Sequence, residues 1–362
     1  MNREELQNHA AETLFKSRRL ICQWATGTGK SGVILKFLKN HPGKCLIVVP
    51  EQNNKENWVD EFIKFGVSLD GVYLACYASL HKYQNTKWDL VVFDEAPHAD
   101  TVKRISYCKS LKANYVIALG AVIDEEEIAA LESNYGKFVR STVSLTDAIN
   151  AGILPSPKIY ICHITLSKQK RLFWRNGHQY NASDYYDMLQ KEVDRAVDTY
   201  SLNPTEANRQ RMFKAGIMRK KFLGELKSDA VKYICNGLNG KNRRFICFCN
   251  SIKQSECLCK EHSYNSHTPA SAKLLEKFNN KEINSLYVVG KLIEGQNLKD
   301  IECGVITQLG STTRITIQSI GRVMRSKNPV IWIPVFDGTK DDSFLYSITS
   351  NIPKQYISHY KL

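Results

Sequence analysis

Trp24-Ala25-Thr26-Gly27-Thr28-Gly29-Lys30-Ser31 follows a short apolar run and precedes a segment with the apolar spacing of a helix. Glycines let backbone N–H groups converge on one point without Cβ clashes, and a helix start adds the positive end of its dipole. In such a loop the Lys30 ammonium reaches the β- and γ-phosphates, and the Ser31 hydroxyl ligates Mg²⁺. Trp24 stands where the pattern usually has its first glycine. The stretch therefore predicts a nucleoside-triphosphate site over residues 26–31, on a strand–loop–helix unit of an α/β fold.

A pair of adjacent carboxylates follows a second apolar run. Leu90–Phe93 has the length of a short strand and ends in Asp94 and Glu95. The carboxyl end of a parallel strand lies at the sheet edge where such folds bind ligands. There Asp94 would hold Mg²⁺, and Glu95 would orient and deprotonate the attacking water. An Asp-Glu pair alone is common, but together with Lys30 and Ser31 it indicates triphosphate hydrolysis.

A third stretch lies near the other end of the chain and reads Gln318-Ser319-Ile320-Gly321-Arg322-Val323-Met324-Arg325. Arg322 and Arg325 are three residues apart, so on a helix their side chains share one face. A planar guanidinium suits the charge that spreads over a γ-phosphate during its transfer. A basic helix that simply faces solvent is the alternative interpretation of this spacing.

Strands and helices alternate in both halves of the chain. In the first half the apolar runs of strand length are Leu20–Cys22, Cys45–Val49, Tyr73–Cys76, Leu90–Phe93 and Tyr115–Leu119. From about residue 230 the strand candidates are Phe245–Cys249, Ser285–Val289, Gly304–Thr307 and Val330–Pro334. This alternation predicts parallel sheets with helices on both faces. A chain of 362 residues suits two such domains, and Pro155 and Pro157 mark a boundary near residue 155.

The segment 156–229 differs from both flanks because it is helix-prone, basic and dotted with aromatic residues. Between residues 158 and 229 it has 14 Lys and Arg against 8 Asp and Glu. Its aromatic residues include Phe173, Trp174, Tyr180, Tyr185 and Tyr186. Basic residues interleaved with aromatics suit a surface that grips a nucleic-acid strand. A helical hairpin whose aromatic side chains pack inward explains the same composition, and both can hold at once.

The overall charge indicates a polyanionic partner. The formal net charge is +14 at pH 7 and the pI is about 9.2, which favours nucleic acid over an anionic membrane surface. A surplus of charge for solubility is the alternative. No stretch approaches the roughly 20 apolar residues of a membrane span, and the N-terminus lacks the features of a secretion signal. We therefore expect a cytoplasmic protein without membrane association.

Eleven cysteines raise the question of disulfides or a metal. Their odd number and scattered positions favour reduced thiols. The densest cluster, Cys247-x-Cys249 with Cys257-x-Cys259, could in principle hold zinc, although C-x-C is not the usual zinc spacing. Alternation along an apolar run places Cys247 and Cys249 on one strand face, where buried cysteine is common.

Taken in chain order, these motifs resemble those of superfamily-2 helicases and translocases, particularly the compact bacterial and phage type related to restriction-enzyme motor subunits. The resemblance spans nearly the whole chain. The matching segments are Leu6-Gln7 (the upstream glutamine), Thr26–Ser31 (motif I), Val48-Val49-Pro50 with Trp58 and Glu61-Phe62 (motif Ia and its following helix), Tyr77–Leu80, Asp94–Ala96 (motif II), Ala148–Leu154, Arg219–Leu223, Phe245–Ser251 (motif IV), Glu294–Asn297 (motif V) and Gln318–Arg325 (motif VI).

The resemblance implies two RecA-like domains, at 1–155 and 230–362, with the helical basic insertion 156–229 between them. It also implies that ATP and Mg²⁺ bind between the domains. In such proteins the residues matching Gln318, Arg322 and Arg325 reach from the second domain to phosphates bound by the first. The resemblance further assigns Gln7 to adenine recognition and Gly295 to nucleotide binding.

The chain departs from the family pattern at three places. Pro97 stands where DEAH-type members have the motif II histidine, and His98 follows it. Motif III reads Ala118-Leu119-Gly120-Ala121-Val122 and has no hydroxyl near its end. Asn297 in motif V replaces a common carboxylate. None of these changes touches the predicted phosphate, metal or arginine residues, but the altered motif III weakens the case for strand separation.

These observations favour an ATP- and Mg²⁺-dependent helicase or translocase, that is, a nucleic-acid-stimulated ATPase. DNA is the favoured substrate and RNA stays open. We expect a monomer that a protein partner could direct to its target. The second hypothesis is a nucleic-acid binding or remodelling module that uses ATP as a switch and separates no strands. A small-molecule kinase with the same loop would leave the second half of the chain unexplained.

Overall fold

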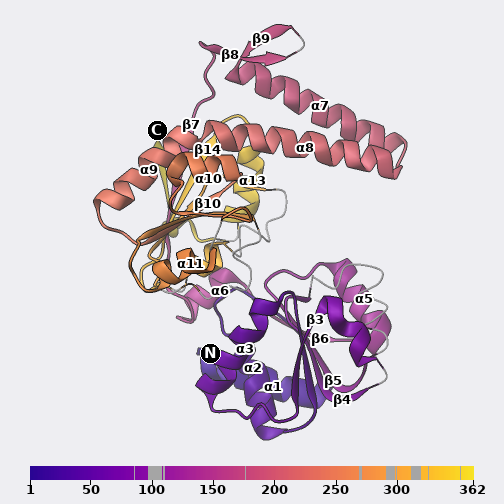
Figure 1. Ribbon diagram of the computed structural model, residues 1–362. Coiled ribbons are helices and arrows are strands. Elements are labelled where there is room, and N and C mark those ends of the chain that lie inside the picture. Colours follow the sequence, from indigo (N-terminus) through magenta and orange to yellow (C-terminus); the bar gives the residue numbers. More distant parts are fainter. Residues whose placement is uncertain are drawn as a thin grey trace. The chain divides into compact units, whose positions relative to one another are not determined.

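The computed structural model describes residues 1–84, 86–96, 108, 111–175, 177–268, 271–290, 298, 300–310, 319–324, 326–350 and 352–362. The chain forms two compact units, the first built on Met1–Ser156 and the second on the chain from Pro157 onward. Each unit has its own sheet of parallel strands with helices around it (Figure 1). The predicted α/β class is therefore confirmed.

Six parallel strands form the sheet of the first unit, in the order β3-β2-β4-β5-β1-β6. They are β1 (Arg19–Trp24), β2 (Cys45–Val49), β3 (Val72–Cys76), β4 (Lys87–Phe93), β5 (Lys112–Gly120) and β6 (Val139–Val143). All five side chains of β2 are buried, as expected for a central strand covered on both faces. All five apolar runs predicted in this half lie in the sheet. The edge strand β6 was not predicted, because its Val-Arg-Ser-Thr-Val sequence buries no side chain and has no apolar run.

Helices cover both faces of this first sheet. In the described part of this unit they are α1 (Arg3–Ser17), α2 (Lys30–Asn40), α3 (Gln52–Phe65), the 3-10 helix η1 (Tyr77–Tyr83), α5 (Glu125–Tyr135) and α6 (Leu145–Asn150). One face packs against α1, α2 and α3 through residues such as Leu14, Phe37 and Phe62. The opposite face packs against η1 and α5 through Leu80 and Leu131. Because both faces are covered, the loops that follow the strands are at the carboxyl edge of the sheet.

The second unit has seven parallel strands in the order β11-β12-β10-β13-β14-β7-β15. They are β7 (Lys158–Ile164), β10 (Phe245–Cys249), β11 (Ser263–Tyr264), β12 (Ser285–Val289), β13 (Cys303–Ile306), β14 (Val330–Phe336) and β15 (Ile357–Lys361). Its helices include α9 (Ser228–Gly240), α10 (Ile252–Cys259), α11 (Ser271–Asn279), α13 (Lys340–Thr349) and the 3-10 helix η4 (Lys354–Tyr356). The Sγ atoms of Cys247 and Cys249 lie 3.8 Å apart on a buried face of β10, in a core cluster that also contains Ile234 and Cys235 of α9.

A helical hairpin extends from the second unit. The antiparallel strands β8 (Arg171–Arg175) and β9 (His178–Asn181) lead into α7 (Ala182–Leu202), which runs beside α8 (Glu206–Leu226) (Figure 1). The structure differs from the expected helical segment at its start, where residues 158–164 form β7. Ile159 and Ile161 alternate on a buried face there, and β7 pairs with both β14 and β15. Residues 158–164 have an apolar sequence of their own, but they stand at the start of a segment whose overall composition is basic and helix-prone.

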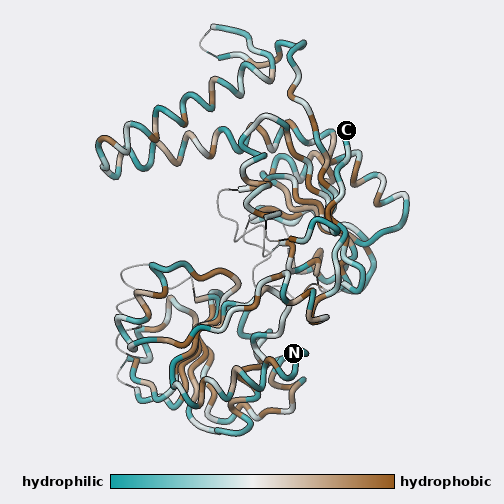
Figure 2. Tube along the Cα trace, turned by 180° about the vertical axis from the view of Figure 1, so that it is seen from behind, coloured by the Kyte–Doolittle hydropathy of each residue, from teal (hydrophilic) through white to brown (hydrophobic). Residues whose placement is uncertain are grey.

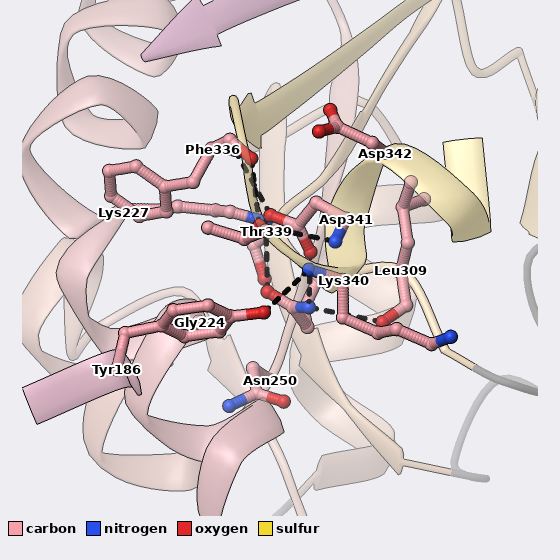
Figure 3. Close-up of polar contacts among 12 residues, drawn as sticks. Tyr186, Gly224, Lys227, Asn250, Leu309, Phe336, Thr339, Lys340, Asp341 and Asp342 are labelled. Atoms are coloured by element: carbon pink, nitrogen blue, oxygen red, sulfur yellow. Dashed lines mark hydrogen bonds and ion pairs between the residues drawn. The ribbon is translucent and has the colours of Figure 1, made fainter. Parts of the chain in front are cut away.

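A buried ion pair ties the base of this hairpin to the second unit. Lys227 Nζ lies 2.6 Å from Asp341 Oδ2, and both side chains are fully buried (Figure 3). Gln308 joins them by accepting from Lys227 at 2.9 Å and donating to Asp341 at 2.9 Å. The Tyr186 hydroxyl of α7 accepts from the backbone N–H of Lys340 at 2.7 Å. Four separate segments of chain therefore meet in one polar network.

The apolar residues gather in the strands of each sheet, whereas α7 and α8 are mixed in polarity along their length (Figure 2). Within the described ranges, no helix is both long and apolar enough to cross a bilayer.

Candidate nucleotide-binding site

The glycine-containing loop joins β1 to α2 in a tight left-handed conformation. Gly27 and Gly29 both have φ of 88°, which L side chains rarely adopt, and Gly29 is the N-cap of α2. The Lys30 ammonium donates to the carbonyl oxygen of Trp24 at 3.0 Å. The Thr28 hydroxyl is buried and donates to the carbonyl of Ala25 at 2.7 Å. The loop thus holds its lysine at the start of a helix, as an anion site requires.

Trp24, which replaces the usual first glycine, is a core residue. Its side chain is fully buried, and its indole N–H donates to Ser141 Oγ of β6 at 2.9 Å. The same residue supplies the carbonyl that accepts from Lys30. The departure from the loop pattern is therefore accommodated by packing against the sheet edge.

Gln7 lies against this loop from α1. It is buried, and its side-chain amide donates to the Gly29 carbonyl at 2.8 Å. A Cβ atom on either Gly29 or Gly32 would collide with the Gln7 amide, so these glycines are needed for the close approach of α1. The structure places Gln7 beside the predicted phosphate loop, and its recognition of adenine stays a prediction.

Asp94 and Glu95 follow β4, as predicted. The Asp94 N–H donates to the Val48 carbonyl at 2.9 Å, and the Tyr77 hydroxyl donates to the Asp94 carbonyl at 3.0 Å. Burial and the neighbouring Glu95 carboxylate raise the pKa of Asp94 to about 6, while the nearby Lys30 ammonium acts in the opposite direction. Glu95 has a φ of 47°, an uncommon backbone conformation for a residue with a side chain. This geometry brings the lysine of the loop and the carboxylates of β4 into one electrostatic site.

Two residues of α3 complete the surroundings of this site. The Trp58 indole N–H donates to Asp94 Oδ2 at 2.9 Å, and the Ser31 hydroxyl donates to Glu61 Oε2 at 3.1 Å. The family resemblance places Trp58 and Glu61 in the helix after motif Ia but gives them no role. The only signal for a shared role was their spacing of three residues, which puts them on one face of a helix.

The remaining predicted site residues lie in the second unit or outside the described residues. Arg322 is half-buried on a short helical stretch, residues 319–323, where Ile320 and Val323 are buried. A Cβ on Gly304 of β13 would lie 2.6 Å from Val323 Cγ2. The glycine therefore lets this helical stretch pack closely against β13. The predicted residues outside the described ones are Gln318, Arg325 and Gly295, together with Pro97, His98 and Asn297 of the altered motifs.

The donor set of the first unit fits a nucleotide with Mg²⁺. The Ser31 hydroxyl and the Asp94 carboxylate are hard oxygen donors of the kind this cation selects. The Lys30 ammonium supplies the positive charge that a triphosphate needs. The Thr26 hydroxyl is buried in the same loop and has no hydrogen-bond partner among the described residues, so a polar ligand would satisfy it.

Comparison with known proteins gives an independent result for the second unit and for the fold. Residues 227–327 match the helicase conserved C-terminal domain. No curated protein sequence matches the chain. The helicase domain of Hef from Pyrococcus furiosus superposes with a TM-score of 0.55 at 15% identity, over 95% of this chain and 97% of that one.

The ATP-dependent Type ISP restriction-modification enzyme LlaBIII, solved bound to DNA, superposes with a TM-score of 0.59 at 14% identity. That match covers 100% of this chain and 31% of the larger enzyme. At such identities the likeness shows the fold alone. Residues 227–327 therefore carry a helicase C-terminal domain, and the chain as a whole shares the α/β fold of these solved structures.

Proposed function

We propose that the protein is an ATP- and Mg²⁺-dependent motor that acts on nucleic acid. The observation that carries this proposal is that the β1–α2 loop and the β4 carboxylates share one site. Helix α3 hydrogen-bonds both Ser31 and Asp94 there, and the nearby Lys30 ammonium partly offsets the burial that raises the pKa of Asp94. A helicase-like fold with a matched helicase C-terminal domain gives that site its context.

Each of the site residues in the first unit has a distinct proposed role. Lys30 binds the β- and γ-phosphates, and Ser31 and Asp94 hold Mg²⁺, which neutralises phosphate charge when bound. Glu95 orients the attacking water and accepts its proton. For Gln318, Arg322 and Arg325, the proposed role is to stabilise charge on the transferring γ-phosphate, and it rests on the family resemblance.

The proposed partner is nucleic acid, with DNA favoured. The net charge of +14 supports a polyanionic partner, and one protein of similar fold was solved bound to DNA. RNA carries the same phosphate charge, so the net charge of the protein supports binding of DNA and of RNA equally. The basic segment 156–229 is the proposed region of backbone contact.

An ATPase titration at fixed salt tests this proposal. Single-stranded DNA, duplex DNA, forked DNA and RNA are each added to the wild type and to Lys30→Ala. We expect nucleic acid to stimulate hydrolysis by the wild type and Lys30→Ala to abolish it. Equal wild-type hydrolysis with and without every nucleic acid would defeat the motor proposal.

The second candidate is an ATP-switched binding or remodelling module without strand separation. The motif III segment favours it, because β5 ends at Gly120 and the chain continues into Ala121 and Val122 without a hydroxyl. A strand-displacement assay beside the ATPase assay separates the two candidates. Hydrolysis without displacement on every duplex geometry would favour the module.

A further inference from the structure

One face of α3 contacts both residues proposed to hold Mg²⁺. Trp58 donates to Asp94 at 2.9 Å, and Glu61 accepts from Ser31 at 3.1 Å. The two metal-ligand candidates come from different segments, one at the start of α2 and one directly after β4. A single helix therefore braces both ends of the site.

We propose that Trp58 and Glu61 are positioning residues that orient Asp94 and Ser31 toward the metal ion of a bound nucleotide. This inference rests on the proposed function, since it takes Ser31 and Asp94 as the metal ligands. In this proposal both α3 residues act through the ligand that they contact, Trp58 through Asp94 and Glu61 through Ser31.

The hydrogen bonds leave the ligand atoms free to bind a cation. A hydroxyl has one proton and two lone pairs, so Ser31 can donate to Glu61 and still present a lone pair to the metal. On Asp94, Oδ2 accepts from Trp58 and Oδ1 accepts from the Glu95 N–H at 3.1 Å. Each carboxylate oxygen has two lone pairs, and one on each remains available. Outer hydrogen bonds of this kind fix the orientation and basicity of metal ligands.

The helix is held firmly enough to serve as a brace. The side chains of Trp58 and Phe62 are buried, and both belong to the core on one face of the first sheet. Glu61 also lies 3.4 Å from the Lys64 ammonium, within the same helix. This packing fixes the face that α3 turns toward the core, and with it the side of the helix from which Trp58 and Glu61 reach the site.

A Mg²⁺ titration of nucleotide binding tests the inference. Calorimetry gives the dissociation constant of β,γ-imido-ATP for the full-length protein at a series of Mg²⁺ concentrations and in EDTA. The variants are Trp58→Phe, Glu61→Ala and Glu61→Gln, of which the last keeps an acceptor oxygen for Ser31. Loss of an outer-shell partner costs about 10- to 100-fold in metal affinity. We expect Trp58→Phe and Glu61→Ala to need at least about tenfold more Mg²⁺ than the wild type for half-maximal binding of the analogue. Glu61→Gln should need nearly the same Mg²⁺ concentration as the wild type.

The chain offers matched controls. Trp88 is buried in the core of the opposite sheet face, and its indole N–H has no partner among the described residues, so Trp88→Phe removes an indole without removing such a hydrogen bond. Glu56 is an exposed acid on α3, so Glu56→Gln removes the same charge away from the site. Both controls should keep the wild-type Mg²⁺ requirement.

The outcomes separate this inference from the proposed function. A wild type that binds the analogue equally in Mg²⁺ and EDTA would sink the metal roles of Ser31 and Asp94. A wild type that requires Mg²⁺, with both test variants unchanged, would overturn the role of α3 alone. Weaker binding of the variants in EDTA as well would indicate general damage to the site and would also count against a positioning role.

Discussion

Among single residues, Trp24 shows how this loop tolerates a departure from the usual pattern. A bulky side chain at that point would obstruct a phosphate if it faced the loop. Here it is buried instead, and its indole is fixed by Ser141 of β6. Its backbone carbonyl still contributes to the loop by accepting from Lys30. The residue has become part of the core that anchors the loop.

Restoring the usual glycine should therefore destabilise the protein. We predict that Trp24→Gly costs about 3 to 5 kcal/mol, the range for truncating a large buried aromatic side chain. Ser141→Ala, which removes only the acceptor of the indole N–H, should cost about 1 to 3 kcal/mol. Urea unfolding followed by circular dichroism measures both. A Trp24→Gly variant as stable as wild type would contradict the anchoring role.

The candidate site was predictable from sequence only in part. Asp94 and Glu95 directly follow an apolar run, so their place at a strand end follows from the chain itself. Lys30 and Ser31 stand between an apolar run and a segment of helical spacing, which predicts their place at a helix start. The contacts of α3 do not follow, because they depend on how far the helix is rotated against the sheet. Helical spacing shows that two residues share a face, but only tertiary packing decides which side chains that face meets.

At the scale of elements, the polar network beneath the α7–α8 hairpin holds separate parts of the second unit together. Lys227 stands between α8 and α9, and Asp341 lies in the first turn of α13. Burial lowers the pKa of the Lys227 ammonium, and the Asp341 carboxylate acts against that shift. The pair is fully enclosed, so neither charge can be hydrated if its partner is lost.

Breaking this pair from one side should be costly. We predict that Lys227→Met destabilises the protein by about 3 to 5 kcal/mol, because Asp341 is left as an uncompensated buried charge. The double variant Lys227→Met with Asp341→Asn removes that charge and should recover part of the loss. Thermal and urea unfolding of the full chain measure the two variants. Equal loss in the single and double variants would contradict the charge argument.

The aromatic residues of the hairpin divide into two groups. Phe173 packs with Tyr185 and Phe222, and Tyr180 packs with Tyr185, which agrees with the inward-packing alternative. Trp174 is different, since 69% of its surface is exposed on β8. Of the aromatic side chains singled out in this segment, it is the one whose ring has room to stack on a base.

We predict that Trp174→Ala weakens binding to single-stranded nucleic acid by about 1 to 3 kcal/mol, the range for losing one base–aromatic stack. Fluorescence anisotropy with a labelled oligonucleotide measures the change. Leu172 on the same strand is comparably exposed, at 67%, so Leu172→Ala controls for the loss of apolar surface. Equal effects of the two substitutions would argue against stacking.

Burial decided whether several of the strands could be predicted from sequence. Central strands such as β2 and β10 bury every side chain, so they appear as unbroken apolar runs. The strands β6 and β15 lie at sheet edges and bury no side chain, and they were not predicted. β7 was hidden for another reason, because its apolar alternation lies at the start of a segment whose composition is basic.

At the scale of the whole molecule, the positive net charge is a property that the folding of the two units does not explain. Each sheet buries its own core, and neither core explains a net charge of +14. A cation of particular interest is Lys220 of α8. Its Nζ lies 3.1 Å from the place that a Cβ on Gly310 would take, and burial lowers its pKa. Among the described residues, no carboxylate forms an ion pair with it. An incoming phosphate would favour the charged form of this partly buried ammonium.

The salt dependence of binding should report this charge directly. Each phosphate contact releases counterions, so we predict that affinity for single-stranded DNA falls about tenfold or more between 50 and 200 mM salt. Lys220→Ala should reduce the slope of log K against log salt by about one, while Lys39→Ala, at an exposed position of α2, should leave it unchanged. Anisotropy titrations at four salt concentrations give the slopes. If the positive charge serves only solubility, the protein should bind no strand tightly at any salt concentration. Weak binding at 50 mM salt, with an affinity that does not change as salt is added, would favour that interpretation. It would also remove the charge argument for a nucleic-acid partner.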